Sequence, residues 1–212
     1  MMGKIIISII GFIVIIIGMI IGGGIGKEVG KVTFSPLKPN AQEGLKKMQS
    51  SLDQVAANHP ELPPSFAKAQ EAQAIANVQL NNKKSQSEKL ITASNQFSGF
   101  YYVNVVTRSK YCAGLGVNIT PFVNNYKLVH SEEYTISAAS LALRNSTPES
   151  LGARLDSFYS SQMNLAMQDM AKMNNVSTAD LCASFAQNAA YFADAYSLKK
   201  MSPATYAALH GY

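Results

Sequence analysis

The sequence is poor in the residues from which disulfide scaffolds and zinc sites are built. Its 212 residues include no tryptophan, only two cysteines, and three histidines that stand far apart. Two cysteines exclude a disulfide-dense miniprotein, and the separation of the histidines disfavours a zinc site with several protein ligands. We therefore expect no metal site and no other cofactor.

Charge is also scarce. Charged residues make up 15% of the chain, against about a quarter in typical globular proteins. The formal net charge is +5, and the excess of basic residues lies within residues 1–111. These residues are scattered or paired, as at Lys46-Lys47 and Lys83-Lys84, and no basic stripe alternates with aromatic residues. This pattern disfavours nucleic acid as a partner.

The motifs of the common catalytic classes are missing. The chain has no GxSxG, no HExxH and no Asp-rich calcium loop. His130 and Glu133, three residues apart, could place a carboxylate beside an imidazole on a helix, but no nucleophile or oxyanion-hole sequence accompanies them. We expect a solvated ion pair at this position, and a protein whose role is not catalytic.

One long apolar run is present. The segment from Ile5 to Ile21 carries no charge, and a helix continued to Gly26 would reach about 33 Å, enough for a hydrocarbon core of about 30 Å. A cleaved signal peptide is the alternative, but its apolar region usually spans about 7–15 residues, and no Ala-x-Ala site follows here. We predict a single transmembrane anchor over residues 5–26, embedded in the lipid bilayer.

Glycines recur every fourth residue at the end of this run, at Gly18, Gly22, Gly26 and Gly30. This spacing places them along one stripe of a helix, where a second backbone can approach closely. One interpretation is association of transmembrane helices, with another copy or with a protein partner. The other is a flexible exit from the bilayer, because each glycine weakens a helix by about 1 kcal/mol.

Beyond the apolar run, the chain divides into three parts. Residues 27–40 contain two prolines and no helical period, which predicts a linker. In residues 41–82, two thin apolar stripes flank a segment with three prolines at 59–64, which predicts a membrane-proximal helical hairpin or stalk. Residues 83–212 hold all ten tyrosines, so we expect the main core there, as a helical bundle.

Helix start signals recur in this bundle region. A Ser or Thr followed by proline occurs at Thr120, Thr147 and Ser202, a pair typical of helix N-termini. The stretch 100–107 has the composition of a strand, but no convincing partner strand exists, so we predict helix there too. The fold class is therefore all-α. The expected uninterrupted helices include residues 120–144, 147–173, 177–196 and 203–210.

Cys112 and Cys182 are the only cysteines and stand 70 positions apart. The spacing excludes a CxxC redox or metal motif. Two buried free thiols are one interpretation. A disulfide is favoured, because the count is even and the chain carries an export-competent segment, and closing so long a loop should stabilise the fold by about 4 kcal/mol. The disulfide favours a location outside the cytoplasm.

Four methionines, Met163, Met167, Met170 and Met173, lie on one side of a predicted helix. Thioethers in an oxidising compartment could bind Cu(I) or Ag(I), which would indicate a periplasmic copper- or silver-binding protein. A methionine-lined groove for a partner helix is a second option. Methionine is also an adaptable filler of helical cores, and we expect core packing.

These features combine into one hypothesis. We expect a single-pass protein of the inner membrane, of a bacterial envelope, whose domain lies in the periplasm and serves binding or assembly with a protein partner. An envelope hydrolase or transferase with an unrecognised site is the alternative, and a structure that places His130 and Glu133 in a pocket beside a Ser or Thr would favour it.

Overall fold

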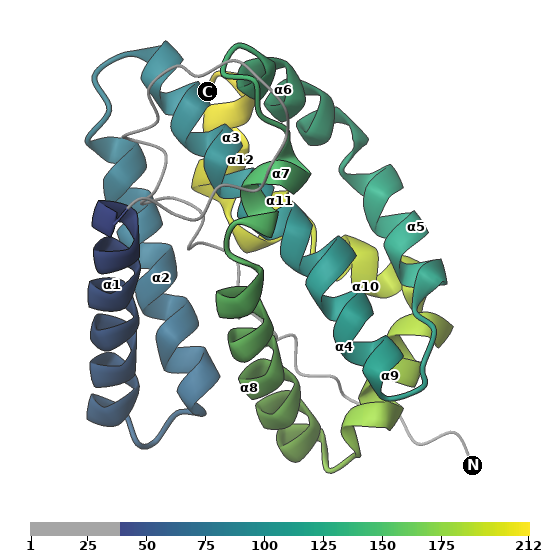
Figure 1. Cartoon of the computed structure of the whole chain (residues 1–212). Coiled ribbons are helices and arrows are strands. Elements are labelled where there is room, and N and C mark those ends of the chain that lie inside the picture. Colours follow the sequence, from purple (N-terminus) through teal and green to yellow (C-terminus); the bar gives the residue numbers. More distant parts are fainter. Residues whose placement is uncertain (1–38) are drawn as a thin grey trace.

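The computed structural model describes residues 39–212, and within this range the chain forms helices and no strand (Figure 1). This result confirms the predicted all-α class. The elements are α1 Pro39–Asn58, α2 Pro64–Asn81, α3 Gln86–Tyr102, the π-helical turn η3 Val103–Thr107, α4 Arg108–Gly114, α5 Thr120–Val129, α6 Ser131–Ala142, α7 Pro148–Ala153, α8 Asp156–Asn174, α9 Thr178–Gln187, α10 Ala189–Ala195, α11 Leu198–Met201 and α12 Pro203–His210.

The predicted membrane anchor over residues 5–26, including the glycine stripe, lies outside the described residues. No helix within residues 39–212 is long and apolar enough to span a bilayer. The transmembrane segment therefore stays a prediction from the sequence.

Helices α1 and α2 form an antiparallel pair at one side of the bundle (Figure 1). The chain reverses between them at the proline-containing segment 59–63, where a helix cannot continue. Met48 and Leu52 of α1 and Phe66 of α2 are buried, and α2 also packs against α3, α8 and α12. The apolar core therefore runs without interruption from the hairpin into the bundle.

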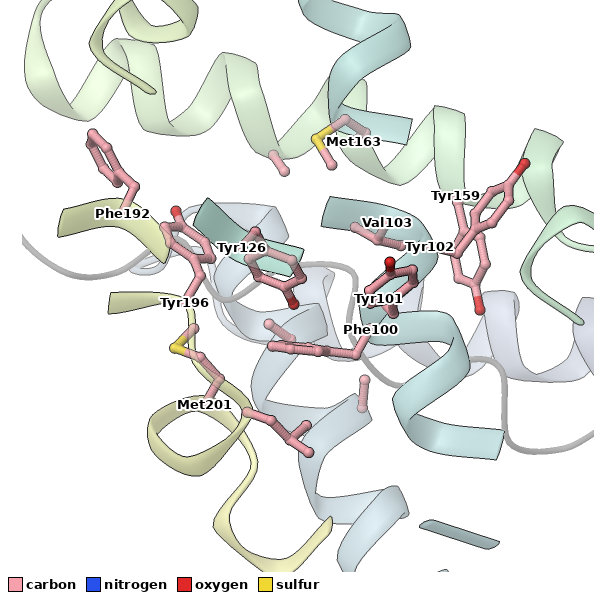
Figure 2. Packing of buried hydrophobic residues seen from close by; sticks show 14 of the residues in the cluster. Phe100, Tyr101, Tyr102, Val103, Tyr126, Tyr159, Met163, Phe192, Tyr196 and Met201 are labelled. Atoms are coloured by element: carbon pink, nitrogen blue, oxygen red, sulfur yellow. The ribbon is translucent and has the colours of Figure 1, made fainter. Parts of the chain in front are cut away.

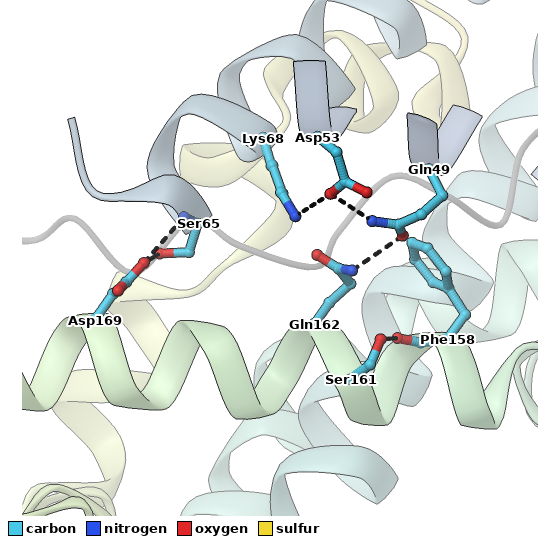
Figure 3. A network of polar contacts seen from close by, with 8 residues as sticks. All are labelled: Gln49, Asp53, Ser65, Lys68, Phe158, Ser161, Gln162 and Asp169. Atoms are coloured by element: carbon cyan, nitrogen blue, oxygen red, sulfur yellow. Dashed lines mark hydrogen bonds and ion pairs between the residues drawn. The ribbon is translucent and has the colours of Figure 1, made fainter. Parts of the chain in front are cut away.

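Polar contacts reinforce the junction between the hairpin and α8 (Figure 3). Gln162 of α8 donates to Gln49 of α1 over 3.1 Å. At the start of α2, the backbone N–H and the hydroxyl of Ser65 both donate to Asp169 of α8. These bonds satisfy polar groups that the packing of the two units removes from water.

Helix α3 is the centre of the bundle and contacts α2, α6, α7 and α12. It begins with a capping box in which Ser85 accepts from the N–H of Glu88 and Glu88 accepts from the N–H of Ser85. The strand-like stretch 100–107 is helical, as predicted, although residues 103–107 form a π-helical turn that leads into α4.

Aromatic side chains fill the core around α3 and η3 (Figure 2). The ring centroids of Phe100 and Tyr126 are 5.8 Å apart, and those of Tyr102 and Tyr159 are 6.0 Å apart. All four rings are buried. Aromatic pairs at these distances contribute about 0.5–1.5 kcal/mol each beyond the burial of their area.

Three helices that we expected to be uninterrupted are broken, and the prediction of their length was wrong. His130 separates α5 from α6, Leu155 separates α7 from α8, and Asn188 separates α9 from α10. At all three residues φ lies between −108° and −115°, outside the helical range. The 25 residues from 120 to 144 would form a rod of about 37 Å, whereas two shorter helices can both pack onto a compact core.

Candidate functional site

Cys112 of α4 and Cys182 of α9 form a disulfide, with their Cα atoms 5.6 Å apart. This confirms the predicted pairing. Both residues are completely buried. The bond therefore joins two helices inside the core, where a reductant in the solvent cannot reach it without local opening of the fold.

A buried arginine lies one helical turn before Cys112. The guanidinium carbon of Arg108 is 4.4 Å from the ring centroid of Phe185 and 4.7 Å from that of Tyr196, with Phe122 at 5.8 Å. Arg108 is 5% exposed, and it forms no ion pair with a carboxylate of the described residues. The π faces of the three rings supply the negative potential that a buried cation needs. We call Arg108 and these three rings the arginine cage.

Asn104 connects the arginine cage to α5. Its side-chain oxygen accepts from Nη2 of Arg108 over 3.0 Å, and its amide donates to the backbone oxygen of Phe100 and the hydroxyl of Tyr126. Burial raises the pKa of Tyr196, and the positive charge of Arg108 opposes that shift. The cage has the geometry of a structural element that fixes α4, α5, α9 and α10 to each other.

His130 is buried, so the expected solvated ion pair with Glu133 was wrong. The residue is 1% exposed, and its ring lies 5.4 Å from that of Phe100. Nδ1 lies 2.8 Å from the backbone oxygen of Tyr126, and Nε2 accepts from the backbone N–H of Leu198 over 3.0 Å. These partners assign the proton to Nδ1, because a carbonyl can only accept. The break between α5 and α6 turns the ring inward.

Burial lowers the pKa of His130 from 6.5 to about 4, so the imidazole is neutral near pH 7. Both of its ring nitrogens are engaged by backbone groups. His130 therefore has no free ring nitrogen with which to act as a general base.

The pKa of His130 predicts a loss of stability in acid. Between pH 6.5 and 4, the unfolded chain binds a proton at this ring that the folded protein does not bind, so the free energy of unfolding falls as the pH falls. The expected loss is about 3 kcal/mol. Urea unfolding at a series of pH values measures this loss. In His130→Gln, the free energy of unfolding should change less steeply with pH over the same range.

His59 supplies the matched control for this measurement. It lies exposed in the turn before α2, 2.9 Å from Glu61. His59→Gln should keep the wild-type dependence of unfolding free energy on pH, because this exposed side chain takes no part in the packing that buries His130. An equal slope in the wild-type protein and in His130→Gln would contradict the prediction.

A second polar cluster lies between α6 and α12, where Glu133 and His210 approach each other; we call these two residues the α6–α12 polar cluster. Oε1 of Glu133 is 3.7 Å from Nε2 of His210. The other oxygen of Glu133, the hydroxyl of Ser137 and Nε2 of His210 are buried without a hydrogen-bond partner. On the opposite side of the ring, Nδ1 is 3.6 Å from Oε1 of Glu132.

The methionines of α8 mostly line the core. Met163, Met167 and Met170 are buried, whereas Met173 is 44% exposed. The sulfur of Met167 lies 4.0 Å from Nη1 of Arg108, and the sulfur of Met170 accepts from the hydroxyl of Tyr196 over 3.7 Å. These contacts are those of core packing. The described residues hold no group of three or more His, Cys, Asp or Glu side chains suited to a metal ion.

Sequence reasoning found the disulfide and the methionine face but missed the arginine cage and the partner of Glu133. Arg108 follows strand-like residues without any local pattern that marks it as buried. Glu133 and His210 are far apart in the chain, so only the packing of α12 onto α6 brings them together.

Comparison with known proteins adds no relative: no family model, curated protein or solved structure matches this chain.

Proposed function

We propose that the chain is a single-pass, membrane-anchored protein of a bacterial envelope, whose helical domain lies in the periplasm and binds or assembles with a protein partner. The observation that carries the proposal is the buried disulfide of Cys112 and Cys182, taken together with the apolar run over residues 5–26. Disulfides of this kind persist in oxidising compartments and are rare in the cytosol.

The type of disulfide supports this location. A redox-active cysteine pair is usually exposed and close in sequence, whereas these two residues are fully buried and 70 positions apart. The bond is therefore structural, and it has to form while the domain folds. An apolar segment of the length found at residues 5–26 provides both the export signal and the anchor that such a location requires.

The location is tested by fractionating cells that express the full chain. Free thiols are blocked in intact cells, and the protein is then denatured and treated with a maleimide–polyethylene glycol reagent, with and without prior reduction. We expect the protein in the membrane fraction, with two added polymers only after reduction. Cys182→Ala, which can gain one at most, calibrates the gel shift. Reduced cysteines, or a protein in the soluble fraction, would refute the proposal.

Self-association through the glycine stripe is one form of assembly that this proposal allows, and a flexible exit from the bilayer is the alternative reading of the same glycines. Gly22→Ile and Gly26→Ile should each abolish cross-linked dimers in membranes, because a large side chain separates the two backbones. Gly23→Ile is the matched control, since residue 23 lies about 100° around the helix from residue 22. Dimers that persist in all three variants would show that the stripe is not the contact.

A further inference from the structure

We propose that one end of the helical domain docks on the surface of an anionic lipid bilayer. This end consists of residues 39–47, 82–89 and 210–212, and we call it the basic end. The proposal rests on the membrane anchor of the proposed function. It adds the orientation of the domain on the bilayer and the chemistry of the lipid that the domain contacts.

The three segments of the basic end lie together because of the way the helices pair. Helices α1 and α2 are antiparallel, so the start of α1 and the end of α2 lie at the same end of the hairpin (Figure 1). Gly211 ends α12 beside the start of α3: a Cβ added to it would lie 3.7 Å from Nε2 of Gln86. The α2–α3 connection and the C-terminus are accordingly at the same end of the bundle in Figure 1.

The connection to the predicted anchor leaves the domain from this end. Residues 27–38 separate the predicted anchor from α1, and even a fully extended segment of this length spans at most about 43 Å. The start of α1, and with it the basic end, therefore stays close to the bilayer surface. A contact that is weak between free molecules becomes populated at the high effective concentration that a short connection provides.

Charges of opposite sign gather at the two ends of the domain. The basic end carries five lysines and two glutamates, which are Lys46, Lys47, Lys83, Lys84, Lys89, Glu43 and Glu88. The opposite end, residues 50–72 and 166–180, carries five acidic residues and two lysines, which are Asp53, Glu61, Glu71, Asp169, Asp180, Lys68 and Lys172. A bond from Ser65 to Asp169 holds the two segments of this opposite end together. The asymmetry turns the basic end towards a negatively charged surface.

The lysines of the α2–α3 region are available to lipid headgroups. Lys83, Lys84 and Lys89 form no ion pair with a carboxylate of the described residues. Two acidic side chains near this end already have partners. Glu43 lies 2.8 Å from Lys47, and Glu132 of α6 lies 3.6 Å from Nδ1 of His210. The positive potential of the basic end is therefore only partly compensated within the domain.

An exposed aromatic residue completes the basic end. Tyr212 is 85% exposed, and its ring stacks on that of His210 with the centroids 6.2 Å apart. Tyrosine is enriched where a bilayer meets water, because its apolar ring and its hydroxyl suit the level of the headgroups. Lysines beside an exposed tyrosine thus combine electrostatic attraction to anionic lipid with a group that enters the interface.

The absence of tryptophan from the sequence allows a test with single probes. Tyr212→Trp reports on the basic end, and His59→Trp, in the exposed turn before α2, reports on the opposite end. Each full-chain variant is reconstituted in vesicles of brominated phosphatidylcholine, with or without phosphatidylglycerol. Phosphatidylglycerol should bring quenching of the Tyr212→Trp emission, and high salt should reverse it. The emission of His59→Trp should stay unquenched in both kinds of vesicle.

Lysine variants measure the size of the effect. Lys83→Gln and Lys84→Gln, each made in Tyr212→Trp, should lower the ratio of docked to undocked protein about fivefold. Lys172→Gln is the matched control, because it removes the same charge from the opposite end and should leave the quenching unchanged. Circular dichroism of each variant confirms that it is folded.

The proposal is overturned if Tyr212→Trp is not quenched in the anionic vesicles or if His59→Trp is quenched equally. It is also overturned if Lys172→Gln reduces the quenching as much as Lys84→Gln does. Alkaline carbonate extraction tests the anchor separately. Release of the full chain by carbonate would refute the anchor of the proposed function, while the quenching would still decide whether the basic end binds anionic lipid.

Discussion

Replacing Cys112 and Cys182 together with alanine should lower the free energy of unfolding by about 4 kcal/mol. The disulfide closes a loop of 70 residues, and its removal lets the unfolded chain sample many more conformations. Both cysteines are fully buried and alanine fits the space of each, so the folded helices should persist under native conditions. Urea unfolding of the full chain in detergent, followed by circular dichroism, gives the difference.

The single variant Cys182→Ala controls for the loss of the sulfur atoms themselves. It breaks the bond but keeps the thiol of Cys112, so its stability should be close to that of the double variant. A double variant that loses less than about 1 kcal/mol would contradict the prediction, since the loop-closure cost for this separation is several times larger.

Arg108→Ala should cost about 3–5 kcal/mol, while Arg108→Met should cost less than about 1.5 kcal/mol. Alanine leaves a cavity between Phe185 and Tyr196 and takes the donor away from Asn104. Methionine restores most of the volume, packs its sulfur against the rings, and removes a buried charge that has no carboxylate partner in the described structure. Urea unfolding measures both changes: the midpoint should shift, while the slope of the unfolding free energy against urea concentration stays the same.

The comparison of the two variants separates volume from charge. If Arg108→Met is as unstable as Arg108→Ala, the interaction of the guanidinium with the rings and with Asn104, and not the filling of space, stabilises the arginine cage. Asn104→Ala, made in the wild-type protein and in Arg108→Met, then measures the coupling between Arg108 and Asn104. Coupling near zero would show that the hydrogen bond between them adds nothing to stability.

Local sequence patterns determined the helical class and the position of most helix starts. Thr147 and Ser177 were expected at helix N-termini and cap α7 and α9, and Ser202 precedes α12. These signals are reliable because a capping side chain bonds a backbone group only a few residues away. The disulfide was also predictable, because two cysteines allow only one intramolecular pair.

The helix ends inside the bundle and the positions of its buried polar side chains depend on contacts between residues that are distant in the sequence. The apolar period continues across His130, Leu155 and Asn188, so periodicity does not reveal the helix ends there. The burial of Arg108 and the approach of His210 to Glu133 likewise require α9, α10 and α12 to be in place. Caps and periodicity act over a few residues and so follow from the sequence by itself. Helix packing decided which polar side chains are buried, because the free-energy cost of burying each one depends on partners that the fold brings from elsewhere in the chain.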